Sequence, residues 1–146
     1  MVTKGTERIP LIILNAFLAL TAIAGGIGML TGSIRPPLEL LEGSPFNTYT
    51  IPGLALLVIV GGSALLATVL LLRRHPFGAW AAIGAGVMIM GYEIVEVLVV
   101  GSDPGLARNL QVFYFMLGLV IAALATWSWF KEHSLRLGGI HRGNLH

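Results

Sequence analysis

The sequence predicts an all-α, polytopic membrane protein whose four transmembrane helices form a compact antiparallel bundle. Hydrophobic residues make up 55% of its 146 residues and charged residues only 11%, whereas a water-soluble domain carries about 25% charged residues. The apolar residues fall into four runs of about 20 residues or more, each long enough to cross a hydrocarbon core of about 30 Å as a helix. The runs do not alternate as membrane β-strands do. With no cysteine in the chain, disulfides and thiol redox chemistry are excluded.

We expect a single transmembrane domain with its helices at about residues 11–31, 53–72, 77–100 and 104–130. The first run follows the basic residues Lys4 and Arg8 and contains Ala22-Ile23-Ala24, a pattern that also occurs in a cleaved signal peptide. The apolar run continues to Leu30, however. We therefore expect a retained signal anchor.

Prolines mark the starts of the later helices. Pro52 and Pro76 can occupy the first turns of the second and third helices, and Asp103-Pro104 fits an N-cap followed by proline at the first helical position. The connection Arg73-Arg74-His75-Pro76 is very short. The second and third helices are therefore expected to be antiparallel neighbours.

The remaining segments are an outer loop, 32–52, and a polar cytoplasmic tail, 131–146. In the loop, Leu38 and Leu41 could rest on the bundle or on the lipid as a short interfacial helix. Basic residues are distributed unequally between the two sides: Lys4, Arg8, Arg73, Arg74, Lys131, Arg136 and Arg142 on one side against Arg35 and Arg108 on the other. Because basic loops are retained inside, both termini are expected to be cytoplasmic.

Small residues predict where the helices touch. Lipid provides no hydrophobic force between helices, so close approach over small side chains supplies much of their contact. On the third helix Ala82 and Gly86 share a face, and on the fourth helix Gly118 and Ala122 share one. We expect these faces to pack against neighbouring helices.

Glu93 and Glu96 are the acidic residues that fall inside an expected span. Burying an ionisable group there costs on the order of 2–3 kcal/mol, so such a group usually faces protein or water. A spacing of three places both carboxylates on one side of the third helix. The start of the fourth helix carries Arg108 and Gln111 at a similar depth. The sequence thus predicts an outer polar cluster that could act as a proton or ion site.

Tyr92 and Tyr114 could add hydroxyl groups to this cluster. A plainer alternative is that Glu96 reaches the surface and pairs with Arg108 while Glu93 makes one interhelical hydrogen bond. The sequence favours this alternative, because polar groups inside membrane helices commonly serve packing.

We expect no catalytic site, metal site or cofactor. His75 and His133 lie at helix ends and leave no histidine pair within the spans to ligate haem. Nothing matches a Ser-His-Asp constellation, a phosphate loop, a zinc-protease motif or a nucleic-acid-binding motif. An enzyme would have to rest on the two glutamates alone.

Several short motifs carry a resemblance: Gly43-Ser44-Pro45-Phe46, Ile51-Pro52-Gly53, Tyr92-Glu93-Ile94-Val95-Glu96 with Gly101, Leu110-Gln111, Phe113-Tyr114-Phe115 and Gly118-Leu119. In these the chain resembles a scattered group of small bacterial four-helix integral membrane proteins of unassigned function. The resemblance covers most of residues 25–125. It implies a four-helix fold in the plasma (inner) membrane of a bacterium, and no particular chemistry.

These observations favour a non-catalytic membrane component that packs against itself or a larger membrane complex and binds lipid or pigment in its grooves. The alternative is a proton- or cation-coupled carrier of a small solute, with Glu93 and Glu96 as the titrating site. A third hypothesis is a lipid-modifying enzyme that uses these carboxylates as acid and base.

Overall fold

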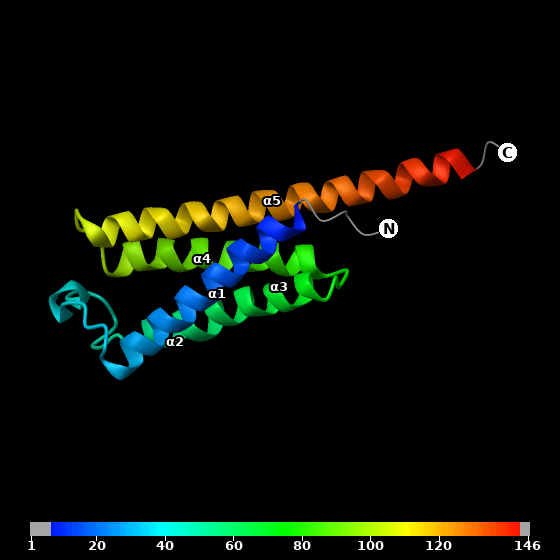
Figure 1. The fold of residues 1–146 in the computed structure, drawn as a ribbon. Coiled ribbons are helices and arrows are strands. Elements are labelled where there is room, and N and C mark those ends of the chain that lie inside the picture. Colours follow the sequence, from blue (N-terminus) through cyan, green and yellow to red (C-terminus); the bar gives the residue numbers. More distant parts are fainter. Residues whose placement is uncertain (1–6, 144–146) are drawn as a thin grey trace.

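The computed structural model describes residues 7–143, and the regular elements in that range are all helical (Figure 1). They are α1 (Arg8–Thr31), the 3-10 helix η1 (Leu38–Leu41), α2 (Thr50–Ala55), the π-helical segment η2 (Leu56–Gly61), α3 (Gly62–Leu72), α4 (Gly78–Val99) and α5 (Leu106–Gly143). Because α2, η2 and α3 follow one another without a break, they form one helix, Thr50–Leu72.

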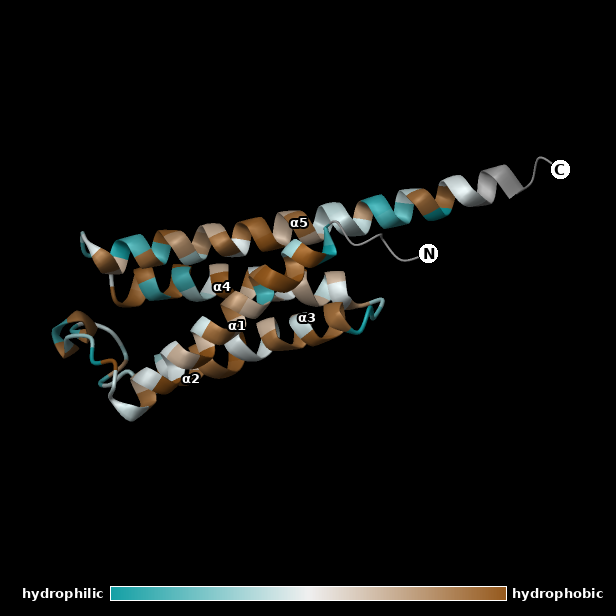
Figure 2. Cartoon of the chain, viewed as in Figure 1, coloured by the Kyte–Doolittle hydropathy of each residue, from teal (hydrophilic) through white to brown (hydrophobic). Residues whose placement is uncertain are grey.

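Four of these helices are long and apolar enough to cross a membrane: α1, the continuous α2–η2–α3 helix, α4 and α5. Hydrophobic residues predominate along these helices, and hydrophilic residues gather in the turns and in the far part of α5 (Figure 2). Many of the large hydrophobic side chains are exposed. Leu20 and Leu98, for example, are 71% and 78% exposed in the isolated chain. Such faces are suited to lipid. The expected fold, an all-helical bundle with four membrane-length helices, is confirmed.

The helices form two pairs that meet in the middle of the bundle. α4 packs against α5 on one side and α3 on the other, and α1 packs along α2, η2 and α3. One end of the bundle holds the start of α1 and the turn between α3 and α4; we call it the terminal end. The other holds residues 32–49 and the connection 100–105; we call it the loop end.

Polar contacts tie the start of α1 to its neighbours at the terminal end. Arg8 donates from Nε to the carbonyl oxygen of Leu71 at 2.7 Å and from Nη2 to that of Leu72 at 3.3 Å. Both carbonyls belong to the last turn of α3, and that of Leu71 also accepts from the backbone nitrogen of Arg74 at 3.2 Å. Glu7 forms an ion pair with Lys131 of α5 at 2.6 Å.

The core depends on small residues, as the sequence predicts. Ala82 is fully buried, and a Cβ atom on Gly86 would lie 2.6 Å from the carbonyl oxygen of Gly118 and 3.0 Å from the nitrogen of Ala122. Only glycine at position 86 therefore allows α4 and α5 to approach this closely. Larger side chains that fill the centre include Leu18, Val60, Ile89 and Ile121, each at most 1% exposed.

All four membrane-length helices begin at residues other than the expected ones, and α1 begins at Arg8, ahead of residue 11. The second span begins at Thr50, ahead of residue 53, which leaves Pro52 in its first turn. α4 begins at Gly78 and α5 at Leu106, so Pro76 and Asp103-Pro104 precede their helices. Gly105, the residue before α5, has a non-helical φ of +120°, which glycine adopts without strain.

The tail beyond residue 130 differs more. α5 continues through it to Gly143, and residues 144–146 lie outside the described part of the chain. The segment contains no proline, and Arg136 pairs with Glu132 one turn earlier at 3.4 Å. Such a pair adds stability to an exposed helix, and a helix already begun elongates more easily than a new one forms.

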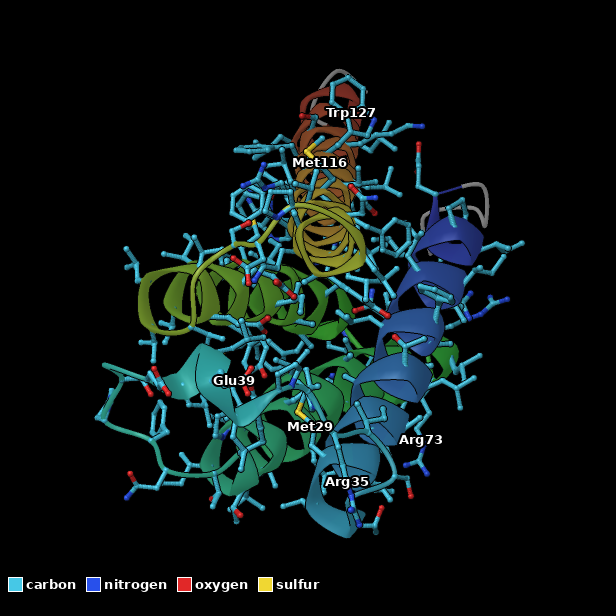
Figure 3. The ribbon with its side chains drawn as sticks, turned by 90° about the vertical axis from the view of Figure 1, so that its left-hand side faces the viewer. Met29, Arg35, Glu39, Arg73, Met116 and Trp127 are labelled. Carbon is cyan, nitrogen blue, oxygen red and sulfur yellow. The ribbon has the colours of Figure 1, made fainter. Side chains whose placement is uncertain are left out.

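The loop lies across the loop end of the bundle (Figure 3). The backbone nitrogen of Ile34 donates to the carbonyl oxygen of Gly28 at 2.9 Å, and the hydroxyl of Tyr49 donates to that of Pro37 at 3.1 Å. Within η1, Leu41 is buried while Leu38 is 61% exposed. Of the two leucines that were expected to rest on the bundle or on lipid, Leu41 is therefore the one that packs onto the protein.

Candidate functional site

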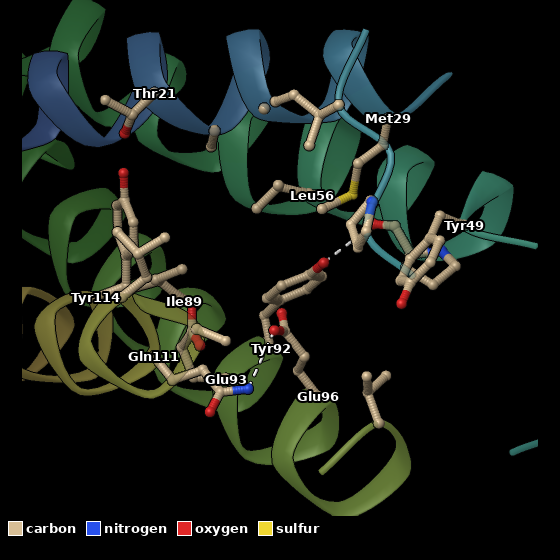
Figure 4. A pocket seen from close by; sticks show the side chains of 18 of the residues that line it. Thr21, Met29, Tyr49, Leu56, Ile89, Tyr92, Glu93, Glu96, Gln111 and Tyr114 are labelled. Atoms are coloured by element: carbon tan, nitrogen blue, oxygen red, sulfur yellow. Dashed lines mark hydrogen bonds between the residues drawn. The ribbon is translucent and has the colours of Figure 1, made fainter. Parts of the chain in front are cut away.

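A cavity of about 540 Å³ lies at the loop end of the bundle (Figure 4). Toward this end the α4–α5 pair and the α1–α2 pair diverge (Figure 1), and side chains from both pairs and from the loop line the space. Most of the wall is apolar and includes Leu18, Met29, Leu56, Ile89 and Leu110. The position and chemistry of the cavity make it the candidate site.

The polar groups on the cavity wall come mainly from α4 and α5. Glu93 and Glu96 line the cavity together with Tyr92, Gln111 and Tyr114. Gln111 donates from Nε2 to Glu96 Oε1 at 3.2 Å and to the carbonyl oxygen of Gly101 at 3.1 Å. The structure therefore brings five of the six residues of the predicted polar cluster to a single cavity.

Tyr92 links this group to the opposite wall. Its hydroxyl donates to the carbonyl oxygen of Pro52 in α2 at 3.3 Å, so one hydrogen bond spans from α4 to the second membrane helix (Figure 4). The same carbonyl oxygen also accepts from the backbone nitrogen of Leu56 within the helix. The bond fixes the ring of Tyr92 beside the two carboxyl groups.

Arg108, the sixth residue of the predicted cluster, does not line the cavity. It is exposed and donates from Nη2 to the backbone oxygen of Ser102 at 2.8 Å and from Nε to its hydroxyl at 3.4 Å. Because α5 begins only at Leu106, Arg108 lies in its first turn and reaches back over the connection from α4. The expected pairing of the Arg108 guanidinium with Glu96 is therefore not formed; the guanidinium lies at Ser102 instead.

The buried acceptors are not all satisfied. Glu93 and Gln111 are each 6% exposed, and Glu93 Oε2 and Gln111 Oε1 have no hydrogen-bond partner among the described residues. Leaving such a group unpaired costs roughly 1–3 kcal/mol, and more when it is charged. A site that retains two unpaired acceptors is therefore suited to a hydrogen-bond donor.

The charge of the wall has one sign. Glu93, Glu96 and Asp103 line the cavity, and none of the described residues that line it is lysine, arginine or histidine. At the rim, burial and then the negative charge of Glu96 raise the pKa of the Tyr49 phenol. Tyr49 therefore stays protonated and keeps its hydrogen bond to the loop.

A second, shallower groove of about 290 Å³ lies between α4 and α5. Glu93, Gln111 and Ser102 line it, and the rest of its wall is apolar and includes Leu98, Val112 and Met116. Glu93 and Gln111 thus lie between the cavity and the groove. A molecule in either space can reach them.

Sequence reasoning missed the π-helical segment and the cavity itself. A Cβ on Gly61 would lie 2.7 Å from the side chain of Ile23, which shows how closely η2 approaches α1. Leu56, the first residue of η2, lines the cavity. A π segment inside a helix often accompanies a functional site, yet the apolar run of residues 56–61 carries no signal that distinguishes it from α-helix.

Within the described residues, no group of three or more histidine, aspartate or glutamate side chains is placed to hold a metal ion. Comparison of the chain with protein families, with curated proteins and with solved structures found no match. The cavity is therefore the feature of the structure that bears most directly on function.

Proposed function

We propose that the protein is a non-catalytic, multi-pass membrane protein that binds a lipid-like or pigment-like molecule in the cavity at its loop end. The volume of about 540 Å³ is the observation that carries this proposal, because binding sites for small organic molecules measure about 300–1,000 Å³ and are mostly apolar. Leu18, Leu56 and Ile89 supply the apolar wall. Burial of an apolar ligand there is favourable in proportion to the area removed from water.

A binding role fits the wall better than a catalytic one. Its polar atoms are chiefly acceptors, and two of its donor groups are engaged: Gln111 Nε2 with Glu96 and Gly101, and the Tyr92 hydroxyl with Pro52. The Tyr114 hydroxyl also lines the cavity. A covalent mechanism requires a nucleophile within hydrogen-bond reach of a base. No such pair is among the described contacts of these residues.

We propose further that the protein lies in the plasma membrane of a bacterium with its terminal end in the cytoplasm. The described basic residues at that end are Arg8, Arg73, Arg74, Lys131 and Arg136; Lys4 and the side chain of Arg142 lie outside the described residues. Because the chain has no cysteine, single cysteines report orientation cleanly. Asn47→Cys should react with a membrane-impermeant maleimide on intact cells, and Ser134→Cys only after lysis; the reverse result would invert the topology.

The outward apolar faces would contact membrane lipids, and through them the protein would associate with a second copy or with a larger membrane complex. Co-purification of a stoichiometric partner from a mild detergent extract tests this part. A lone monomer under those conditions would contradict it.

The binding role is tested by what the purified protein retains. Lipid extraction and mass spectrometry of protein from native membranes should recover one tightly held apolar molecule per chain. Ala24→Trp, which places an indole in the cavity from an exposed position on α1, should abolish its retention. Ala123→Trp is the matched control, since Ala123 is also exposed on a helix but does not line the cavity. Equal retention by both variants would refute the proposal.

A second candidate, a proton- or cation-coupled carrier of a small solute, is favoured by the position of Glu93. This carboxyl lies between the cavity and the groove, where a proton could pass from one space to the other. Proteoliposomes loaded with a pH-sensitive dye should then show proton flux that Glu93→Gln abolishes. Flux equal to that of protein-free liposomes would exclude this candidate.

A further inference from the structure

We infer that the ligand of the cavity is a lipophilic ammonium: an apolar body that carries a protonated primary or secondary amine, bound by Glu93, Glu96 and Gln111. This inference rests on the proposed binding function and specifies the class of molecule that the site takes. Charge, hydrogen bonding and shape support it independently.

The first observation is the missing countercharge. The cavity wall carries the carboxyl groups of Glu93, Glu96 and Asp103 and no described basic residue, and Arg108 is turned away to Ser102. Charge interactions are strong inside a low-dielectric site, and a buried charge is normally paired. A cationic ligand supplies the pairing that the chain itself does not provide. A fatty acid or a phosphate would add negative charge to a negative wall.

The second observation is the pair of unpaired acceptors. Gln111 Nε2 is held by two oxygens, Glu96 Oε1 and the carbonyl of Gly101, so its orientation leaves Oε1 as an acceptor. Glu93 Oε2 is the other buried acceptor without a partner. A primary ammonium has three N–H donors, enough for both atoms. A quaternary ammonium has none and would leave both unpaired.

The third observation is the shape and lining of the cavity. Leu18, Leu56 and Ile89 provide room for an apolar body beyond the polar group. The rings of Tyr92 and Tyr114 also line the space, and aromatic faces attract cations at short range. The groove between α4 and α5 reaches the same two polar residues from the lipid-facing side. An amphiphile could therefore enter from the membrane with its amine leading.

The test uses one alkyl chain with four head groups. Protein in phosphatidylcholine nanodiscs is incubated at neutral pH, where the amine is protonated, with dodecylamine, dodecyltrimethylammonium, dodecanoic acid or dodecanol. Native mass spectrometry counts the bound molecules. We expect one dodecylamine per chain, bound at least tenfold more tightly than the other three, since one charge-assisted hydrogen bond is worth about tenfold or more in affinity.

Variants then locate the site. Glu93→Gln, which keeps the shape of the side chain, should weaken dodecylamine binding by at least about tenfold. Glu39→Gln is the control, because Glu39 is exposed on η1 and does not line the cavity. Circular dichroism and gel filtration check that each variant folds. Should Glu93→Gln fail to fold, Gln111→Met removes the second acceptor, and it should weaken binding as well.

The inference is overturned if dodecanol, dodecanoic acid or the quaternary ammonium binds as tightly as dodecylamine. It is also overturned if the amine binds equally well to Glu93→Gln. Either result leaves the proposed function standing, provided that Ala24→Trp still loses the retained molecule. If Ala24→Trp retains it as fully as Ala123→Trp does, the proposed function fails instead.

Discussion

Adding a single methyl group at Gly86 should separate α4 from α5. A Cβ at this position would lie 2.6 Å from the carbonyl oxygen of Gly118, whereas ordinary contacts begin at 3.4 Å, so the helices must move apart by about 0.8 Å. The atoms in the way include backbone, and they cannot swing aside as a long side chain does. Overpacking of this kind costs typically 1–3 kcal/mol. We therefore expect Gly86→Ala to lower the free energy of unfolding by about that amount.

The matched control is Gly84→Ala on the same helix. A Cβ at Gly84 would meet nothing within 4 Å, and alanine is the better helix former by roughly 1 kcal/mol or less, so this variant should be neutral or slightly stabilised. Unfolding can be followed in detergent by tryptophan fluorescence, because the rings of Trp80 on α4 and Trp129 on α5 lie 5.4 Å apart. Equal stability of the two variants would refute the close approach of α4 and α5.

Three further predictions use the same unfolding assay. Glu93→Leu should raise the stability of the ligand-free protein by about 1–3 kcal/mol, because it removes a buried acceptor without a partner; a loss of stability would show that the carboxyl group is paired. Arg8→Ala should lower stability by about 1–2 kcal/mol because it removes two hydrogen bonds that join α1 to the end of α3, while Arg73→Ala, at an exposed position in the adjoining turn, should change it little; equal effects would contradict a role for these two bonds in stability. Lys131→Ala should cost less than about 1 kcal/mol and should matter less as salt rises, since its ion pair with Glu7 is partly exposed.

The fold could be predicted from the sequence because a membrane imposes simple demands on a chain. Each span must be apolar for about 20 residues, and the four runs meet that demand. The packing faces at Gly86 and at Gly118 could also be predicted, since small residues at helical spacing mark where backbones approach, but that these two faces meet each other comes from the structure. Both inferences use periodicity within one helix, which a sequence displays directly.

The candidate site was only partly predictable, for a different physical reason. Glu93, Glu96 and Gln111 share a cavity as their depth suggests, but the partner of Arg108 could not be predicted. Arg108 lies in the first turn of α5, and its long side chain bonds to Ser102 in the connection rather than to a carboxyl group. The cavity arises from the divergence of helix pairs, a property of how helices cross that no local pattern records.

The π-helical segment η2 also determines how the second span responds to a change in length. A π turn closes its hydrogen bonds over five residues, so it holds one residue more than the equivalent stretch of α-helix. Deleting one residue from Leu56–Gly61 should convert the segment to α-helix and leave the faces before and after it in register. The same deletion in the middle of α4 would rotate everything beyond it by about 100°, carrying the glutamates away from the cavity. The second membrane helix can therefore lose a residue within η2 without rotating the segment that follows, whereas α4 cannot lose one without such a rotation.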